Sequence, residues 1–566
     1  MGIQLLRRLQ HSGASSLRLR ARVHPAALVH VATLIGGGAL LRAFTTKQWF
    51  FNDEWEFLVD RGFAGRPLQL LVPHNEHWST LPLLVYRTLF GIVGVRTYTP
   101  YIVVLLLLHL VLAHALWRLM RHSGVDPWIA TALAGLFILI GSGFENLTWA
   151  FQIGFVGSVL FGVLALLSTD VRPHGRRRLV MEWAFCVAAL MCSGIGVSMV
   201  VMVGLGALLR RGVRAGVSVV IVPAVVYGAW FVTVGRVGYV GVGLKPSDAA
   251  LLVPYIWHGL TATFDALTDV MGAGVVVIIG LALWLAVRRR NAIRHPAMTA
   301  AALTAPIFFL IDGVGRIALG VDQAGAPRYI YIAAVLLLPL AGNVMSHLAG
   351  GRVLFRALVV LVVAAATLHQ ALVLQAEGQA LATIRSSEQR QVIAAAQLLH
   401  SGMQTIATVP DPQWATALTV SDLEALDAHD DLPAPIGLMP VDFLNARLAL
   451  QTSLTTDPVF SGGASPAVAS AAPALHADAS GCVPPIAGGA PHVTLAFSQP
   501  ASIRIAPAIG GMIALRLQLA GQPGVSDPIT QPLAAAHVLW LNVAQAGETL
   551  ILALPSATAL CGVATR

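Results

Sequence analysis

The stretch TPYIVVLLLLHLVLAHALWR, residues 99–118, decides the fold class. It is apolar almost throughout and has the ~20 residues that a helix needs to cross the hydrocarbon core of a bilayer. Further apolar runs cover residues 25–45, 127–143, 151–169, 179–197, 198–209, 216–235, 271–287, 297–311, 328–346 and 354–375, of which 198–209 is the weakest candidate. The sequence therefore predicts a polytopic α-helical membrane protein with about 11 transmembrane helices.

The composition of the whole chain agrees with lipid as its solvent. Of its 566 residues, 56% are hydrophobic and only 11% are charged, whereas about a quarter of the residues in soluble domains are charged. The formal net charge of +9 is concentrated in short connections between the apolar runs, where positive charge marks cytoplasmic loops. We therefore interpret the basic excess as a topology signal and expect no nucleic-acid partner.

Arginines set the predicted orientation in the membrane. They precede the first run and recur in short connections: Arg7, Arg8, Arg18, Arg20, Arg22, Arg118, Arg121, Arg172, Arg176, Arg177, Arg178, Arg210, Arg211, Arg214, Arg288, Arg289, Arg290, Arg294, Arg352 and Arg356. The N-terminus is then cytoplasmic, and the first run, which lacks a small-residue cleavage site, is an anchor. If the apolar stretch 81–95 were a further span, every later arginine-rich loop would lie outside the cell. We therefore expect this stretch to form an amphipathic helix along the outer interface. The C-terminus is then extracytoplasmic.

The chain divides into three predicted parts. Residues 1–376 form the transmembrane domain, whose long outer loops are 46–98 and 236–270. Residues 377–404 are interpreted as a helical connector, and residues 405–566 as an extracytoplasmic, mainly β, sandwich-like domain. The clearest predicted strands are 492–497, 513–519 and 538–543. Residues 461–480, which are rich in Ser, Gly, Ala and Pro, are expected to form a flexible insertion.

The four cysteines fall into two pairs. Cys482 and Cys561 lie in the predicted outer domain, where the surroundings are oxidising in most cells, so a disulfide between them is expected. Cys186 and Cys192 fall in one apolar run and are expected to be small buried residues.

The first outer loop begins with the acidic motif Phe51-Asn-Asp-Glu-Trp-Glu-Phe57. A carboxylate partly removed from water by aromatic neighbours can have a raised pKa and act as a general base, or it can hold a divalent cation. Asp53 and Glu54 are therefore the candidate catalytic residues. The alternative is a solvated loop whose aromatic residues form an interfacial belt.

A second polar motif, Pro73-His-Asn-Glu-His-Trp78, follows in the same loop. On a helix, His74 and His77 would share a face and could complete a site for Mg²⁺ or Mn²⁺ with Glu54. Hydrogen bonding of substrate hydroxyls by His74, Glu76, His77 and Trp78 explains the motif equally well. The spacing differs from that of zinc proteases, so no protease is inferred.

Two later connections add further candidate substrate-binding residues. Glu145 ends an apolar run, where a carboxylate is either functional or caps the next helix. Arg316 and Arg328, with Tyr329, flank an outer loop, and a planar guanidinium suits a phosphate at the headgroup level. Interfacial anchoring, or pairing of these arginines with a nearby aspartate, is the alternative.

These features together resemble the GT-C superfamily of membrane glycosyltransferases, which includes protein mannosyltransferases and actinobacterial arabinofuranosyltransferases. The similar features are a cytoplasmic N-terminus, a large first outer loop with an acidic pair, here Asp53-Glu54, and an outer C-terminal domain. The resemblance implies that the acidic residue is the catalytic base and that the donor is a sugar linked to a polyprenyl phosphate. The second acidic pair of this class is reduced here to Glu145.

The sequence thus leads to the hypothesis of a plasma-membrane glycosyltransferase. It would move a hexosyl or pentosyl group, with inversion, from a polyprenyl-phosphate donor to a glycan or glycolipid acceptor of the cell envelope, in cell wall biogenesis. Two alternatives from other classes are a transporter or flippase and a non-catalytic envelope-assembly protein. The Ala-, Val- and Arg-rich composition suggests a high-GC bacterium.

Overall fold

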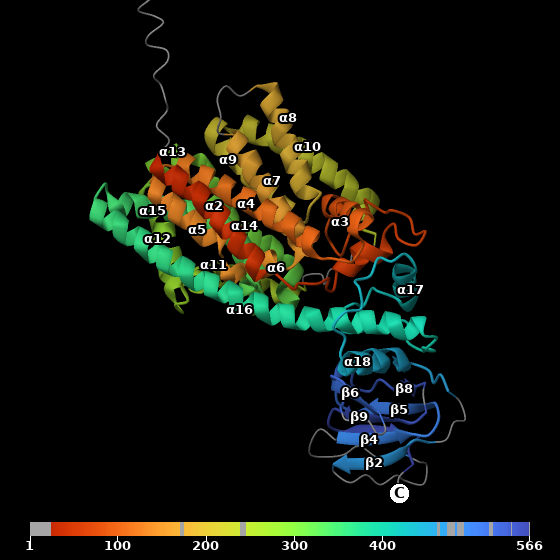
Figure 1. Ribbon diagram of the computed structural model, residues 1–566. Coiled ribbons are helices and arrows are strands. Elements are labelled where there is room, and N and C mark those ends of the chain that lie inside the picture. The colour runs from red at the N-terminus through yellow and green to blue at the C-terminus, as the bar shows by residue number, and fades with distance from the viewer. Residues whose placement is uncertain are drawn as a thin grey trace, which may run out of the picture.

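The computed structural model describes residues 24–169, 175–237, 245–460, 465–472, 482–483, 492–519, 524–544 and 546–564. It contains a helical bundle, a long helix that leaves the bundle, and a β-domain beside the C-terminal half of that helix (Figure 1). Several sequence-based predictions lie outside the described residues, namely the orientation signal of the N-terminal arginines and Arg172, and most of the insertion 461–480.

The helical part extends from residue 25 to residue 400. Its main helices are α2 (Pro25–Phe44), α3 (Thr80–Val93), α4 (Thr99–His122), α5 (Pro127–Ile138), α6 (Glu145–Thr148), α7 (Ile153–Thr169), α8 (Arg176–Leu190), α9 (Gly196–Arg211), α10 (Val213–Trp230), α11 (Leu252–Thr268), α12 (Ala273–Val287), α13 (Arg289–Arg294), α14 (Pro296–Arg316), α15 (Pro327–Ala349) and α16 (Val353–His400). Short 3₁₀ or π turns are η1 (Glu56–Asp60), η2 (Gly141–Gly143), η3 (Ala150–Gln152), η4 (Phe231–Gly235), η5 (Pro246–Leu251), η6 (Ile317–Leu319) and η7 (Val321–Gly325).

The bundle has the helices of a multi-pass membrane protein, as predicted. Within the described residues, 7 helices are long and apolar enough to cross a membrane, and the bent pair α11 and α12 raises this number to 8. Each predicted run contains a helix, but α5, α8 and α9 have only 12, 15 and 16 residues. Helices α5 and α8 are thus shorter than the predicted runs 127–143 and 179–197, whereas α9 is longer than the predicted run 198–209. All three have fewer than the ~20 residues of a spanning helix.

Residues 236–270 are not simply a loop, contrary to the prediction. They contain α11, a helix of 17 residues that is bent by 116° from α12. Polar residues break up the apolar run in this helix, yet Tyr255, Gly259 and Phe264 are buried. Packing against α14 and α15 stabilises a helix that a search for continuous apolar residues cannot detect.

The stretch 81–95 forms α3, an amphipathic helix of 14 residues, as predicted. Leu83, Tyr86 and Phe90 lie on its buried side, whereas Leu84 and Ile92 are exposed. A helix of this length spans only about 21 Å at 1.5 Å per residue, too little for a crossing. Its place at the outer membrane interface stays a prediction.

Helix α16 is continuous over 48 residues and includes most of the predicted connector 377–404. It leads to a segment with two further helices, α17 (Val420–Ala428) and α18 (Pro440–Gln451). Leu423 of α17 belongs to the core of the helical bundle, and Leu448 of α18 to the core of the β-domain. The segment therefore joins the two parts, and the strands begin only at Thr452.

The C-terminal part is a β-sandwich, as predicted. Its strands are β1 (Thr452–Thr455), β2 (Ala467–Ala472), β3 (Cys482–Val483), β4 (His492–Phe497), β5 (Ala501–Pro507), β6 (Gly511–Leu519), β7 (Ile529–Leu533), β8 (Leu539–Val543), β9 (Glu548–Ala553) and β10 (Thr558–Cys561). Two antiparallel sheets have the orders β1-β8-β5-β10-β3 and β2-β4-β9-β6-β7. Alternate residues such as Ile503, Ile505, Leu515 and Leu517 are buried, because successive side chains in a strand point to opposite faces.

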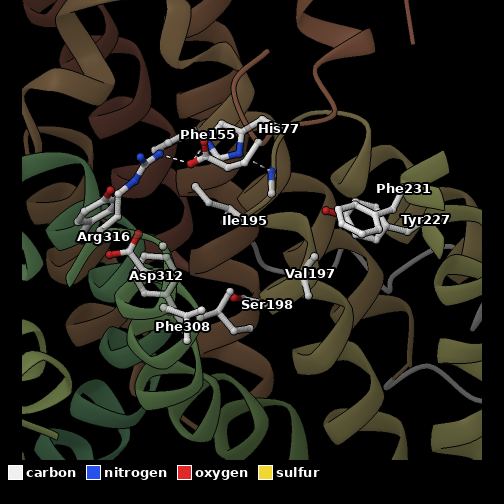
Figure 2. Close-up of a pocket in the computed structure, with 16 residues that line it drawn as sticks. His77, Phe155, Ile195, Val197, Ser198, Tyr227, Phe231, Phe308, Asp312 and Arg316 are labelled. Carbon is white, nitrogen blue, oxygen red and sulfur yellow. Dashed lines mark hydrogen bonds and ion pairs between the residues drawn. The ribbon is translucent and has the colours of Figure 1, made fainter. Parts of the chain in front are cut away.

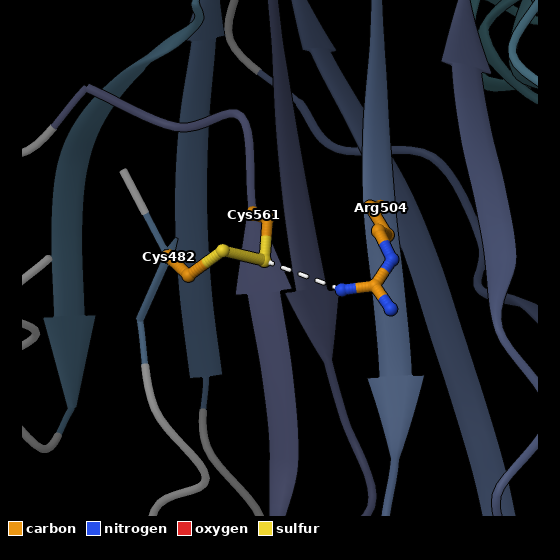
Figure 3. Close-up of a disulfide and its surroundings, with 3 residues drawn as sticks. All are labelled: Cys482, Arg504 and Cys561. Carbon is orange, nitrogen blue, oxygen red and sulfur yellow. Dashed lines mark hydrogen bonds between the residues drawn. A yellow bond between two sulfur atoms is a disulfide. The ribbon is translucent and has the colours of Figure 1, made fainter. Parts of the chain in front are cut away.

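The structure contains the expected disulfide between Cys482 and Cys561 (Figure 3). The two cysteines are cross-strand partners in β3 and β10, which makes the bond a link across the edge of one sheet. Arg504 of the neighbouring strand β5 lies with its guanidinium 3.7 Å from the Cys561 sulfur. Cys186 and Cys192 are free and buried in the bundle.

Candidate active site

The acidic motif after α2 begins with a tight turn that directs neighbouring carboxylates to different sides. Asn52 has φ 46°, the left-handed region that asparagine adopts more readily than most residues. The amide of Trp55 donates to the Asn52 carbonyl over 3.1 Å, which closes the turn. As a result, Asp53 and Glu56 stay partly exposed, with 38% and 39% side-chain exposure, whereas Glu54 is completely buried.

Glu54 is a structural residue in this geometry. The hydroxyls of Tyr86 and Tyr98 donate to its carboxylate, the second over 2.9 Å, and the amide of Phe51 donates over 2.9 Å. Burial raises the pKa of Glu54 to about 7, although these hydrogen bonds and the charge of Arg385 act in the opposite direction. A carboxylate enclosed in this way has no access to a substrate hydroxyl.

His74 and His77 are placed by a two-residue turn, not by the helix that was considered for them. Their backbones exchange two hydrogen bonds, of 3.0 and 2.9 Å, around Asn75, whose φ is 51°. This arrangement suits asparagine, which tolerates the left-handed conformation in tight hairpin turns. The two imidazoles consequently serve different neighbours.

His74 lies between the two exposed carboxylates of the acidic motif. Its Nε2 is 3.7 Å from Asp53 Oδ2, and its Nδ1 is 2.8 Å from Glu56 Oε2. Nδ1 is buried without an aligned hydrogen bond, so the short contact is an ion pair rather than a good hydrogen bond. Burial lowers the pKa of His74, but Asp53 and Glu56 outweigh this effect and raise it to about 9.

Asp53, Glu56 and His74 form the one group of possible metal ligands in the described part of the chain, with ligand atoms within 4.8 Å of one another. The expected set of Glu54, His74 and His77 is therefore not the one that the fold brings together. Glu54 is turned inward onto two tyrosines, and His77 faces Glu76. Two carboxylate oxygens and one imidazole suit Mg²⁺ or Mn²⁺, and the misaligned, buried Nδ1 of His74 fits a ligand that lacks its metal.

His77 faces a separate group at the mouth of a cavity. Its Nδ1 accepts a hydrogen bond of 3.3 Å from the Gly194 amide, and its Nε2 is 3.7 Å from Glu76 Oε1 (Figure 2). Because Nδ1 is an acceptor, the proton of the neutral ring belongs on Nε2. Burial lowers the pKa of His77, and the charge of Arg316, which forms an ion pair with Glu76, adds to this effect.

The cavity beside His77 has a volume of about 310 Å³ and lies between α9, α10 and α14. Its polar lining includes Asp312 and Arg316 of α14, and its apolar lining includes Phe155 and Phe308 (Figure 2). The Tyr255 hydroxyl donates to Asp312 over 2.5 Å. Charged and aromatic side chains therefore line the cavity together, as in sites that bind a polar group with an apolar extension.

Glu145 and Arg328 form a second arginine-carboxylate pair next to this cavity. Arg328 Nη1 donates to Glu145 Oε2 over 3.2 Å, and its guanidinium lies 5.3 Å from the ring centre of Tyr329, which lines the cavity. Burial raises the pKa of Glu145, opposed by the charge of Arg328. Both predicted arginines are thus paired with glutamates that the sequence had also singled out, Glu76 and Glu145, rather than with aspartates.

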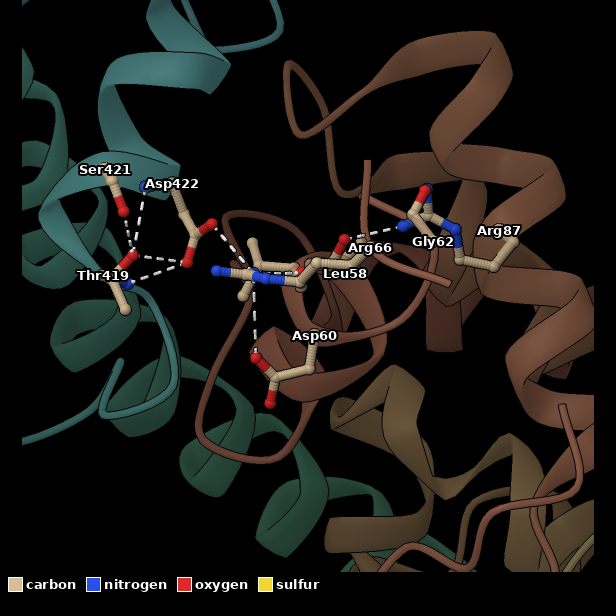
Figure 4. Close-up of polar contacts among 9 residues, drawn as sticks. Leu58, Asp60, Gly62, Arg66, Arg87, Thr419, Ser421 and Asp422 are labelled. Atoms are coloured by element: carbon tan, nitrogen blue, oxygen red, sulfur yellow. Dashed lines mark hydrogen bonds and ion pairs between the residues drawn. The ribbon is translucent and has the colours of Figure 1, made fainter. Parts of the chain in front are cut away.

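Three arginines hold the loop that carries these residues. Arg87 donates to the carbonyls of Leu58 and Gly62, and Arg66 donates to Val59 and pairs with Asp422 at 2.9 Å (Figure 4). The third, Arg61, donates to the carbonyls of Val72 and Pro73, each over 2.7 Å, directly before His74. These bonds fix the π turn η1 that carries Glu56 against the turn that carries His74.

One predicted site residue lies outside the cavity, and several residues near the site were not predicted. Trp78 is buried, stacks on Trp230 at 5.1 Å and does not line the cavity. The missed residues are Glu56 and Asp312, together with the positioning residues Arg61, Arg66 and Arg87. Glu56 is the third acid of the motif already quoted, so the sequence contained a signal for it, whereas the carbonyl partners of the arginines become visible only in the fold.

The chain is similar to two membrane glycosyltransferases of known structure. For the Archaeoglobus fulgidus oligosaccharyltransferase, solved with Zn and sulfate, the identity is 12% and the TM-score 0.38, over 73% of this chain and 58% of that one. For ArnT from Cupriavidus metallidurans, solved with undecaprenyl phosphate, the identity is 13% and the TM-score 0.39, over 76% of this chain and 93% of that one. No protein-family model and no curated protein sequence matches the chain.

The present chain spans 58% of the length of the oligosaccharyltransferase. Identities this low do not carry residue roles from one protein to another, so the roles proposed below rest on contacts within this chain.

Proposed function

We propose that the protein is a membrane glycosyltransferase that moves a sugar from a polyprenyl-phosphate donor to a hydroxyl of an envelope glycan or glycolipid. The observation that carries this proposal is that two groups of charged side chains meet at the turn of His74 and His77: Asp53 and Glu56 contact His74, and Glu76 with Arg316 contacts His77. Accessible carboxylates, Asp53 and Glu56, lie on the side of His74, and the guanidinium of Arg316 lies in the cavity wall. His77, which lines the same cavity as Arg316, is held to His74 by two backbone hydrogen bonds.

Asp53 is assigned as the general base and Glu54 is not. Asp53 is partly exposed, whereas the carboxylate of Glu54 is enclosed by tyrosines. In the proposed step, Asp53 accepts the proton of the acceptor hydroxyl while the oxygen of that hydroxyl bonds to the anomeric carbon. The bond from this carbon to the phosphate oxygen breaks, and its electron pair stays on the phosphate. One displacement of this kind inverts the anomeric centre.

Arg316 and Arg328 are assigned to the departing lipid phosphate. Each guanidinium is already close to a carboxylate, Glu76 and Glu145 respectively, so each is held in a fixed position before the donor binds. A fixed donor group is effective where negative charge grows during the reaction. The apolar side chains of the lining, Phe155 and Phe308 among them, would contact the first part of the polyprenyl chain or a sugar face.

A divalent cation is part of the proposal. Asp53, Glu56 and His74 would hold Mg²⁺ or Mn²⁺, which when bound supplies positive charge for the donor phosphate. Each residue of the group offers one ligand atom. With one oxygen of Asp53 on the cation, its second oxygen would take the acceptor proton.

The orientation proposed from the sequence completes the account. A cytoplasmic N-terminus in the plasma membrane would place the acidic motif after α2, and the β-domain after α16, on the extracytoplasmic side. Donor lipid and envelope acceptor would then meet on that side.

The test uses purified protein, a panel of radiolabelled polyprenyl-phosphate sugars and an envelope glycan extract. We expect transfer by the wild type and loss of transfer in Asp53→Asn. Asp269→Asn is a matched control, because the Asp269 side chain is 74% exposed and forms an ion pair with the surface residue His369. Undiminished transfer in Asp53→Asn would exclude the proposed base, and no transfer by the wild type from any such donor would favour a transporter or an assembly protein.

A further inference from the structure

A polar groove lies between the end of α2 and the second half of α16, away from the cavity described above. Its volume is about 630 Å³, and its polar lining consists of Thr46, Lys47, Gln375, Gln379, Thr383 and Ser386, with Arg390 at one end. In the described part of the chain, no residue lines both this groove and the cavity beside His77. The groove is therefore a separate feature of the protein.

The chemistry along the groove changes within one stripe of α16. Residues three or four positions apart share a helix face, and the stripe that enters the groove reads Leu368, Leu372, Gln375, Gln379, Thr383, Ser386 and Arg390. Leu368 and Leu372 are 65% and 57% exposed, although they belong to the apolar half of a candidate span. Apolar side chains thus lead directly into amide and hydroxyl groups, at the point where the helix changes from apolar to polar.

The groove has an excess of positive charge. Lys47 is exposed and has φ 63°, a conformation that is costly for a side chain other than glycine or asparagine. Arg390 contributes no net charge, because its Nε is 3.2 Å from both oxygens of Asp442. The lining residues that the structure describes include no acid. One uncompensated cation therefore faces a row of neutral hydrogen-bonding groups.

We propose that this groove binds the headgroup of an anionic membrane phospholipid, with its single phosphodiester charge on Lys47. Hydroxyls of the headgroup meet the amides of Gln375 and Gln379, and an acyl chain lies along Leu368 and Leu372. Basic pockets between transmembrane helices take anionic headgroups in this manner. A free glycan or a peptide would match the polar half of the stripe but would leave the exposed leucines unexplained.

The test exploits the lysine content of the chain, because Lys47 and Lys245 are its two lysines. The protein is placed in nanodiscs of phosphatidylcholine with or without phosphatidylglycerol, and the modification of each lysine by an amine reagent is followed by mass spectrometry. Both lysines are exposed, so Lys245 controls for a general effect of the anionic surface. Phosphatidylglycerol is expected to slow modification of Lys47 about tenfold, as for a site occupied at ten times its dissociation constant, and to leave Lys245 nearly unchanged.

Two variants sharpen the result. Thr383→Trp fills the groove and should remove the protection of Lys47, whereas Ile384→Trp, on the neighbouring exposed face, should keep it. Equal slowing of both lysines, or protection by added polyprenyl phosphate but not by phosphatidylglycerol, would overturn the proposal. The comparison between the two lysines is made on the wild type, so it holds even where Thr383→Trp does not fold.

Discussion

The two sides of the acidic motif differ more than its sequence suggests. On the outer side, Asp53 and Glu56 lie against one imidazole and remain accessible to solvent. On the inner side, Glu54 is enclosed by Tyr86 and Tyr98 and belongs to the packing of α3 and α4 against the motif. Neighbouring acids therefore have different roles: Asp53 and Glu56 are accessible to a ligand, and Glu54 stabilises the position of the motif.

Removal of the inner carboxylate is expected to have the largest effect on stability. Glu54→Leu leaves the hydroxyls of Tyr86 and Tyr98 without their acceptor, and an unpaired buried polar group costs about 1–3 kcal/mol. The loss should appear as a lower midpoint in an SDS unfolding titration. Glu54→Gln retains one acceptor oxygen and should lose less. A Glu54→Leu protein as stable as the wild type would show that the inner side is not structural.

The outer side is expected to lose metal affinity when a ligand is removed. Glu56→Gln should weaken Mn²⁺ binding, followed by electron paramagnetic resonance, by about tenfold or more, since loss of groups that support a metal costs 10–100-fold. His77→Gln is the control, because His77 faces Glu76 rather than the ligand group. If His77→Gln weakened binding and Glu56→Gln did not, the ligand set expected from the sequence would be correct after all.

A smaller effect is expected at the turn that places His74. Asn75→Ala keeps the chain length but puts an ordinary side chain at φ 51°, which costs roughly 1 kcal/mol. Asn75→Gly removes this backbone cost, because glycine adopts the conformation freely. Both variants lose the 3.2 Å contact of Asn75 Nδ2 with His74 Nε2, so Asn75→Gly should bind Mn²⁺ more tightly than Asn75→Ala. Mn²⁺ affinity of the two variants measures the difference. Equal affinities would mean that the turn does not determine the position of His74.

Candidate site residues could be named from the sequence, but the orientation of their side chains could not. Asp53, His74, Arg316 and Arg328 were all identified from residue type and place in the chain. Which acid faces outward depends on the left-handed turn at Asn52, and periodicity carries no information about such a turn. Glu56 gains its role only when the loop folds back to bring His74 beside it, through contacts between residues far apart in the sequence.

A similar limit applies to the fold. Strand β4 occupies the residues predicted for it, 492–497, because strict alternation is a strong local signal. Helix α11 was missed because tertiary packing, not continuous hydropathy, stabilises it. In segment 405–451, proline and glycine suggested loops and strands, yet Pro440 and Asp442 begin α18 as first-turn residues of a helix.

The measurement that tests the division of the motif most directly compares two amide variants in one assay. Asp53→Asn and Glu54→Gln are each purified and measured for both sugar transfer and the midpoint of SDS unfolding. Asp53→Asn should lose transfer by ~10²- to 10⁴-fold, the range for a general base, with an unchanged midpoint. Glu54→Gln should keep most of its transfer and unfold at lower SDS. Loss of transfer in a stably folded Glu54→Gln, with an active Asp53→Asn, would contradict the account.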